Sequence, residues 1–145
     1  MIVDCHGHYT TAPAELGNWR KLQTEGKTPA ALRISDDQIR ESLEAAQLKI
    51  QRERGTDVTF FSPRASAMEH HVGDEQASLA WTRVCNDLIR RCCSLYPGKF
   101  VAVCQLPQSP GAPPKNSAQE LERCVKELGF IGCNLNPDPS GGYWK

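Results

Sequence analysis

The chain contains 145 residues, of which 39% are hydrophobic and 23% charged, and its 17 basic residues balance its 17 acidic ones. This composition excludes a disordered chain and predicts one globular domain over residues 1–145. The balanced charge, without a basic stripe interleaved with aromatic residues, excludes an electrostatic nucleic-acid binder. No apolar run approaches the ~20 residues of a membrane span, so a cytoplasmic protein without a membrane partner is expected.

The first part of the chain predicts a strand, a long loop and a helix. Residues 2–5 are an apolar run of the length of a short buried strand, and the glycines and prolines of residues 10–33 predict a long loop. The sequence SDDQ at residues 35–38 is a capping box, which predicts a helix start. This helix is expected to end at Gly55. Its apolar face is expected to comprise Ile39, Leu43, Ala46 and Ile50.

A second and a third strand follow, with a helix between them. Residues 57–61 are β-branched and aromatic and predict the second strand, while residues 100–105 predict the third. The helix between them is expected to end before the PG pair at residues 97–98. Its apolar stripe is expected to comprise Ala80, Val84, Leu88, Cys92 and Leu95.

The last unit begins with a proline-rich loop at residues 107–115. A second capping box, SAQE at residues 117–120, predicts a helix start, and Gly129 predicts its end. The apolar residues of this helix are expected to be Leu121, Val125 and Leu128. Residues 130–135 predict a fourth strand.

The seven cysteines predict buried thiols rather than a disulfide framework. Their number is odd, no CxxC pair occurs, and most of them fall at apolar positions of the expected elements. They are Cys5, Cys85, Cys92, Cys93, Cys104, Cys124 and Cys133.

Apolar strands that alternate with amphipathic helices predict an α/β fold with a parallel sheet. Two architectures fit, a doubly wound open sheet and the first four strands of a (β/α)₈ (TIM) barrel. No glycine-rich phosphate turn follows the first strand, and the loops after the strands are long and polar, which favours the first half of a barrel. A complete barrel needs ~250 residues, so we expect a truncated, N-terminal part of one. Because its edge strands are open, we expect this chain to be poorly soluble or to self-associate.

His6 and His8, in DCHGHY, follow the first strand with one glycine between them. The period of two in a strand sends both side chains to one face, at the barrel rim where active sites lie. Two imidazoles there could share one divalent ion, of zinc, manganese, iron or cobalt, or could instead bond to backbone carbonyls. We predict that they are metal ligands.

Other polar residues after the strands are candidates for a binding pocket. Arg64, in FFSPRAS, could clamp a carboxylate or form a rim salt bridge. The adjacent His70 and His71 are not expected to share one ion, since adjacent loop side chains point apart. One of them could line the pocket or be a solvated loop histidine. Asn134 and Asn136 could donate to substrate oxygens or cap a turn.

Four segments together resemble the 4-oxalomesaconate hydratase family, in the decarboxylase-like branch of the metal-dependent amidohydrolases. They are DCHGHYTTAP, FSPRAS, LPQSPG and NLNPDPSGGYW. The resemblance implies a (β/α)₈ barrel with one divalent metal, usually zinc, and the HxH pair of the family matches His6 and His8.

The resemblance also implies a reaction and a substrate. Members of this family hydrate the carbon–carbon double bond of 4-oxalomesaconate, a tricarboxylate, to 4-carboxy-4-hydroxy-2-oxoadipate in bacterial breakdown of protocatechuate or gallate. It therefore implies substrate-binding roles for Arg64, Ser66, His71 and Asn134, and we expect a homo-oligomer. A further histidine ligand and an acidic residue have no counterpart here, and the general base, which the sequence does not identify, is expected beyond Lys145, so this chain by itself should be inactive.

Two other functions remain open from the sequence. One is a metal-dependent decarboxylase of the aminocarboxymuconate-semialdehyde type, which shares the HxH start and acts on acidic substrates. The other is a non-catalytic half-barrel that associates with copies of itself or with a complementary half.

Overall fold

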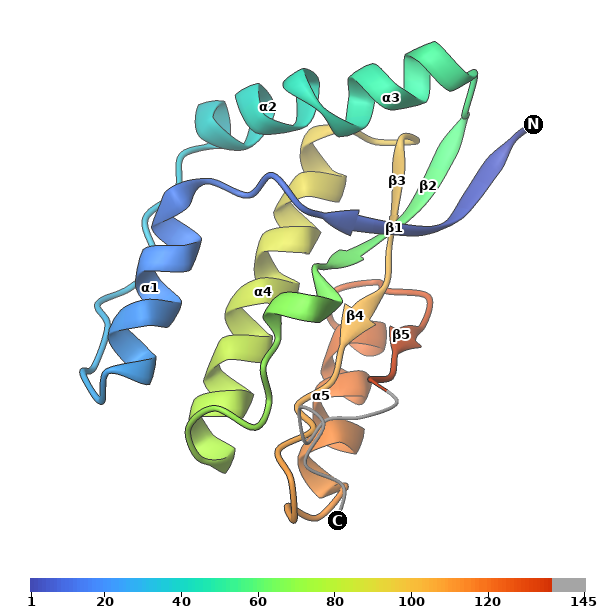
Figure 1. The fold of residues 1–145 in the computed structure, drawn as a ribbon. Helices are drawn as coiled ribbons and strands as arrows, with labels where there is room; N and C mark the ends of the chain where they lie inside the picture. Colours follow the sequence, from blue (N-terminus) through green and yellow to red (C-terminus); the bar gives the residue numbers. More distant parts are fainter. Residues whose placement is uncertain (137–145) are drawn as a thin grey trace.

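The computed structural model describes residues 1–136 of the chain (Figure 1). The strands pair in parallel and helices connect them, which confirms the predicted α/β class. The elements, in chain order, are β1 (Val3–Tyr9), α1 (Ala14–Thr24), α2 (Asp36–Ala45), α3 (Gln47–Arg54), β2 (Val58–Pro63), the 3₁₀ helix η1 (Ala65–Ala67), α4 (Glu75–Leu95), β3 (Phe100–Ala102), β4 (Cys104–Gln105), α5 (Lys115–Lys126) and β5 (Cys133–Asn134).

The sheet follows the order of the chain. β1, β2 and β3 form one parallel sheet, and β4 pairs in parallel with β5. The strand predicted at residues 100–105 is divided at Val103, because the Val103 N–H donates to Phe61 O whereas the Cys104 N–H donates to Gly132 O. The first part of the predicted strand thus pairs with β2, and its last part pairs with β5. Parallel neighbours in sequence order, joined by helices, are the arrangement of the first part of a (β/α)₈ barrel, as predicted.

The segment predicted as a loop at residues 10–33 contains the helix α1, so that prediction is wrong. Leu16, Trp19, Arg20 and Gln23 recur at helical spacing, and Trp19 stacks on Trp81 of α4 with ring centroids 5.9 Å apart. Gly17 weakens the helix because a glycine loses much backbone freedom there, but it does not prevent the helix from forming. The packing of one face on α4 outweighs the glycine.

The single helix predicted from residue 36 to Gly55 is two helices. The capping box is present at Ser35 and Gln38, and Gly55 ends α3 with φ of +66°, as predicted. Ala46 breaks the helix with φ −132° and ψ −83°. After the break the faces change, so that Ile50 is 46% exposed and Leu48 is buried in its place.

The second capping box is absent. Helix α5 begins at Lys115, after Pro114, and Ser117 Oγ donates to Pro107 O at 2.6 Å. Glu120 is fully buried and accepts hydrogen bonds from Asn86 of α4 and from Arg123. The Glu120 carboxylate is thus occupied by charge-assisted hydrogen bonds, one of them from the other helix, and does not make the local bond that a capping box requires.

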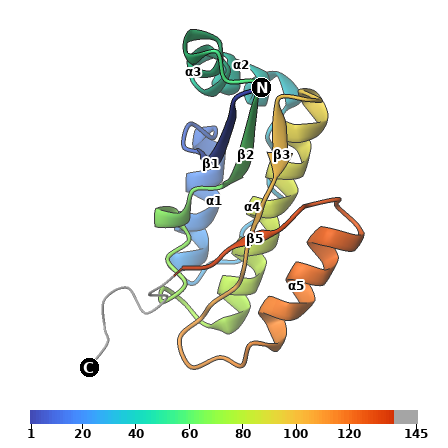
Figure 2. The same cartoon turned by 90° about the vertical axis from the view of Figure 1, so that its right-hand side faces the viewer.

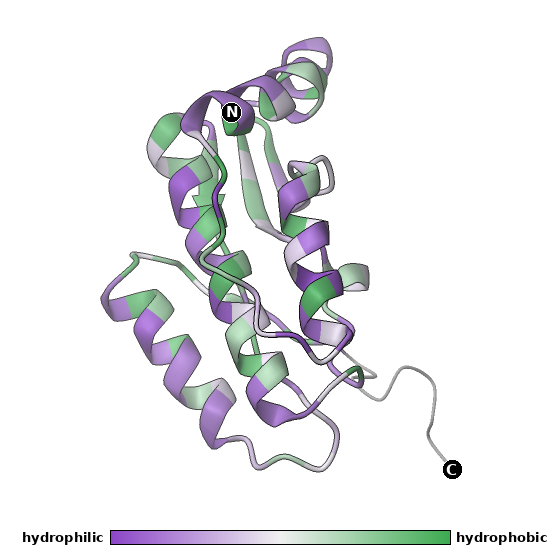
Figure 3. Cartoon of the chain, turned by 90° about the vertical axis from the view of Figure 1, so that its left-hand side faces the viewer, coloured by the Kyte–Doolittle hydropathy of each residue, from purple (hydrophilic) through white to green (hydrophobic). Residues whose placement is uncertain are grey.

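The core lies between the sheet and the helices on one side of it. Figure 2 shows α1 and α4 behind the strands, and Figure 3 shows hydrophobic and hydrophilic residues alternating along the helices. Of the predicted α4 stripe, Leu88 and Cys92 are buried, whereas Ala80 is exposed and Trp81, Cys85 and Ile89 fill the core.

The two edges of the described structure are open. β1 was expected to be buried, but Val3 is 41% exposed; next to β5, at the other edge, Ile131 is 58% exposed. The strand predicted at residues 130–135 is reduced to Cys133–Asn134. Within residues 1–136, no helix has the length and apolar character that crossing a membrane requires.

Candidate metal centre

The carboxyl-terminal half of β1 brings His6 and His8 together. Their Nε2 atoms lie 3.0 Å apart, and their rings are nearly perpendicular, with an interplanar angle of 83° and centroids 4.6 Å apart. Both rings therefore direct the same nitrogen toward one point. Two nitrogens this close can be bridged by one ion bound at about 2.1 Å from each.

Gly7 permits this part of β1 to lie close to β2. The register of the two strands shifts between Asp4 and Gly7, as in a β-bulge. A Cβ at Gly7 would lie 2.2 Å from the Thr59 side chain and 3.1 Å from Phe60 O. Only glycine fits here without displacing a strand, and the close approach places His8 beside Ser62.

His8 is held by the end of β2. Its Nδ1 lies 2.7 Å from Ser62 Oγ and 3.1 Å from Pro63 O. Ser62 is 1% exposed, and its Oγ accepts a hydrogen bond of 2.8 Å from Asn134 Nδ2 of β5. Three strands thus contribute to the position of one imidazole ring.

The surroundings of His8 favour its neutral form. Burial lowers the pKa of His8, and the positive charge that His6 would carry lowers this pKa further. A neutral imidazole is the form that binds a metal ion. The two nitrogens therefore fit half of a metal site. Among residues 1–136, no group of three or more histidine, cysteine or acidic residues could complete it.

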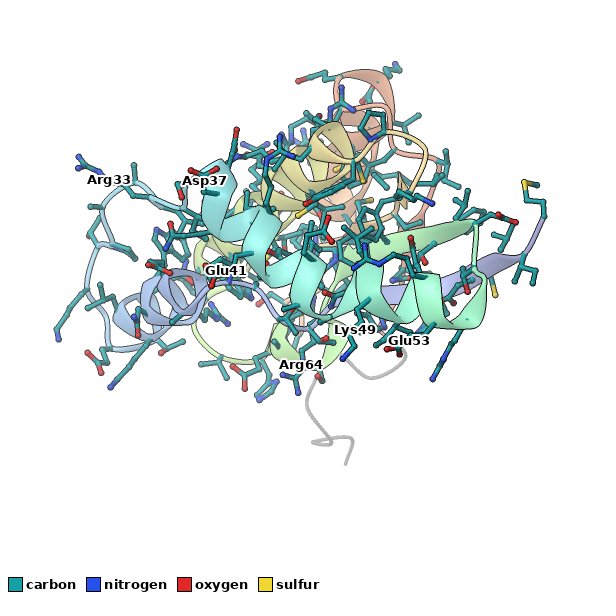
Figure 4. All side chains as sticks on the ribbon, turned by 90° about the horizontal axis from the view of Figure 1, so that it is seen from above. Arg33, Asp37, Glu41, Lys49, Glu53 and Arg64 are labelled. Carbon is teal, nitrogen blue, oxygen red and sulfur yellow. The ribbon has the colours of Figure 1, made fainter. Side chains whose placement is uncertain are left out.

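The other predicted pocket residues are divided between two cavities. Asn134 and His6 line a cavity of about 280 Å³ on the strand side. Arg64 and Ser66 line another, of about 610 Å³, between α1 and α4, and Arg64 Nε donates to Ser66 Oγ at 3.0 Å. Figure 4 shows Arg64 at the periphery of the molecule. The described structure thus brings Arg64 and Ser66 to each other, in a cavity that neither His6 nor His8 lines.

His71 and His70 differ sharply in exposure. His71 is exposed in the turn before α4, whereas His70 is 1% exposed and its Nδ1 lies 2.8 Å from Ser78 Oγ. Asn136 exchanges two hydrogen bonds with the side chain of Gln108, through its backbone N–H and C=O. These bonds link the backbone of Asn136 to the loop that contains Gln108, and the predicted roles of the Asn136 side chain stay predictions.

Two polar residues near the histidines were not predicted. Ser62 is paired with His8 in the parallel register. Counting by two along the strand places Ser62 on the same face of β2 as Phe60, and this spacing could have identified it. Gln105 ends β4 fully buried, and its Nε2 lies 3.5 Å from Pro63 O, the carbonyl that also contacts His8. No local motif indicates Gln105.

A family model described as amidohydrolase matches residues 3–145. The chain therefore belongs to the amidohydrolase family. Its parallel strands, with two histidines at the end of the first, agree with that assignment.

Two hydratases are similar over the whole chain. The chain is 55% identical to the 2-keto-4-carboxy-3-hexenedioate hydratase of Sphingobium sp. strain SYK-6, over 100% of the chain and 44% of that protein. It superposes on the crystal structure of 4-oxalomesaconate hydratase from Rhodopseudomonas palustris with a TM-score of 0.91 and 49% identity, over 99% of this chain and 44% of the other. The chain thus spans less than half the length of the relatives it matches.

A decarboxylase is more distant. The dihydroxybenzoic acid decarboxylase of Polaromonas sp. JS666, solved with bound manganese and an inhibitor, shares 25% identity at a TM-score of 0.62, over 93% of this chain and 38% of the other. The hydratases are therefore much closer in sequence than this decarboxylase.

Proposed function

We propose that this chain supplies the first part of the metal site of a hydratase that adds water to the double bond of 4-oxalomesaconate, giving 4-carboxy-4-hydroxy-2-oxoadipate in aromatic-acid breakdown. The observation that carries the proposal is the pair of Nε2 atoms 3.0 Å apart at the end of β1. The 55% identity with a hydratase over the whole chain gives the reaction class.

The metal is proposed to be one divalent ion, bound by His6 and His8. We favour zinc, which neutral imidazoles bind well; manganese, present in the decarboxylase structure, is the other candidate. When bound, such an ion polarises an oxygen of the substrate or lowers the pKa of a water molecule. The remaining ligands and the general base are proposed to lie outside the described residues.

Arg64 is proposed to bind a carboxylate of the substrate. Its Nε bond to Ser66 fixes the guanidinium, and a guanidinium held in this way can present its terminal nitrogens to a carboxylate. Asn134, on the cavity that His6 also lines, and His71 are proposed to contact other oxygens of the tricarboxylate.

The surroundings of the protein are proposed to be the bacterial cytoplasm, and its assembly a homo-oligomer. All seven cysteines are free thiols, as a reducing compartment favours. The exposed apolar residues at both sheet edges supply surface for association.

The test uses the chain alone and the chain extended by any residues that its gene encodes beyond Lys145. Each is freed of metal, reloaded with zinc or manganese, and mixed with 4-oxalomesaconate while the ultraviolet absorbance of the conjugated substrate is followed. We expect absorbance loss and a hydroxy acid product with the extended, metal-loaded protein. Release of carbon dioxide would indicate a decarboxylase instead, and full turnover without metal would overturn the proposal.

A further inference from the structure

Ser62 lies at the centre of a set of hydrogen bonds behind His8. Its Oγ is 2.7 Å from His8 Nδ1, 2.8 Å from Asn134 Nδ2, 3.2 Å from Gly7 O and 3.3 Å from Pro63 O. A hydroxyl has one hydrogen and two lone pairs, so these contacts can be assigned.

Three of the groups around Ser62 have fixed roles. The amide nitrogen of Asn134 can only donate, so it takes one lone pair of Ser62 Oγ. The carbonyls of Gly7 and Pro63 can only accept. The single hydroxyl hydrogen can therefore be donated to Gly7 O, the closer carbonyl, or to His8 Nδ1 if that nitrogen carries no hydrogen. In the first arrangement the second lone pair of Ser62 remains for His8, whose Nδ1 must carry a hydrogen to use it.

The carbonyl of Pro63 selects the first arrangement. It lies 3.1 Å from His8 Nδ1, and a carbonyl oxygen next to an unprotonated nitrogen would place two lone pairs against each other. The opposite tautomer, with its hydrogen on Nε2, would be destabilised by this repulsion. The unprotonated Nε2 of His8 also suits the contact of 3.0 Å with His6, whose Nε2 hydrogen can point to it when no ion is bound.

We propose that Ser62, oriented by Asn134, is a positioning residue that holds His8 in the Nδ1–H tautomer and so directs the Nε2 lone pair at the metal. The inference rests on the proposed metal site and gives Asn134 a role besides substrate binding. Because Ser62 is 1% exposed, water does not readily replace its hydroxyl. Partners of this kind fix both the tautomer and the ring orientation of a ligand histidine.

Substitution of Ser62 tests the proposal in the metal-free protein. In Ser62→Ala, long-range ¹H–¹⁵N spectra should show a larger share of His8 protonated on Nε2, whereas Ser62→Thr, which keeps a hydroxyl, should restore the wild-type spectrum. A matched control is Ser78→Ala, which removes the hydroxyl 2.8 Å from buried His70. It should change the His70 signals and leave those of His8 unchanged.

The affinity for zinc, measured by calorimetry, is the second readout. We expect it to fall about tenfold to a hundredfold in Ser62→Ala and to be recovered in Ser62→Thr. The milder Asn134→Ala should give a smaller fall in the same direction, which keeps the test valid if Ser62→Ala does not fold.

The outcomes separate this inference from the proposed function. Unchanged His8 tautomer and unchanged zinc affinity in Ser62→Ala would overturn the inference while leaving the metal site intact. A wild-type protein in which His8 carries its hydrogen on Nδ1, but which binds neither zinc nor manganese in any form, would instead overturn the proposed function. Loss of affinity that Ser62→Thr does not recover would mean that Ser62 acts through packing alone, against the inference.

Discussion

The buried imidazole of His70 predicts that the protein loses stability in mild acid. His70 lies in the turn before α4, and its Nε2 has no hydrogen-bond partner. Arg20 of α1 donates to the carbonyls of Glu69 and Val72, on both sides of His70, which places a permanent positive charge nearby. A protonated His70 would therefore bury a second cation with an unsatisfied N–H.

The magnitude follows from the change in protonation on folding. Burial first, and then the charges of Arg20 and His71, lower the pKa of His70 from 6.5 to about 4. The unfolded chain thus binds more protons than the folded one between these values, so stability falls as the pH falls from about 6.5 toward 4 and this contribution is fully lost below that. At about 1.4 kcal/mol per pKa unit, the total is about 3 kcal/mol, of which about 2 kcal/mol is lost by pH 5.

Urea unfolding followed by circular dichroism at pH 7.5 and pH 5 measures this loss. The His70→Asn variant keeps a polar group that can reach Ser78 but cannot titrate, so its stability should fall by about 2 kcal/mol less than that of the wild type over the same interval. Equal losses in the two proteins, or a His70 resonance that titrates near pH 6.5 in the folded protein, would refute the reasoning.

Three further predictions concern packing and the open edges. Gly7→Ala, whose Cβ would lie 2.2 Å from the Thr59 side chain, should destabilise the protein by about 1–3 kcal/mol in urea unfolding, while Gly17→Ala in α1, with open space around it, should not; equal stability of both variants would contradict the close approach of β1 and β2. Glu120→Ala should lower the free energy of unfolding by roughly 3 kcal/mol because it leaves buried hydrogen-bond partners unpaired, and a change below 1 kcal/mol would show that the pair contributes little. Ile131→Lys at the open edge should reduce self-association of the chain in analytical ultracentrifugation, and an unchanged sedimentation profile would exclude this edge as the contact.

Local patterns predicted the elements whose signals are confined to neighbouring residues. The capping box at Ser35 and the left-handed stop at Gly55 are found as predicted, because each depends on hydrogen bonds within a few residues. The four apolar runs all contain strand residues, although the first run is exposed and the last strand is reduced to Cys133–Asn134. The parallel arrangement followed from the alternation of strands and helices. The same approach missed α1, since Gly17 and the surrounding polar residues weaken the local signal that Trp81 restores through packing.

Local motifs were misleading where a distant residue competed for the same side chain. SAQE has the residues of a capping box, but Glu120 is bound by Asn86, which is 34 positions away. The break at Ala46 likewise has no marker in the sequence. Neither the Glu120 bond to Asn86 nor the break at Ala46 can be predicted from neighbouring residues alone.

The sequence by itself determined the metal-site hypothesis, because two histidines separated by one residue share a face of any strand. That relation depends only on the period of the backbone. Only the tertiary structure decided which nitrogen each ring presents and what stands behind it. Ser62 and Asn134 lie 54 and 126 residues from His8 in the chain, and their contact with its site depends on strand register, a β-bulge and a glycine against Thr59. These are properties of paired strands, which no single segment encodes.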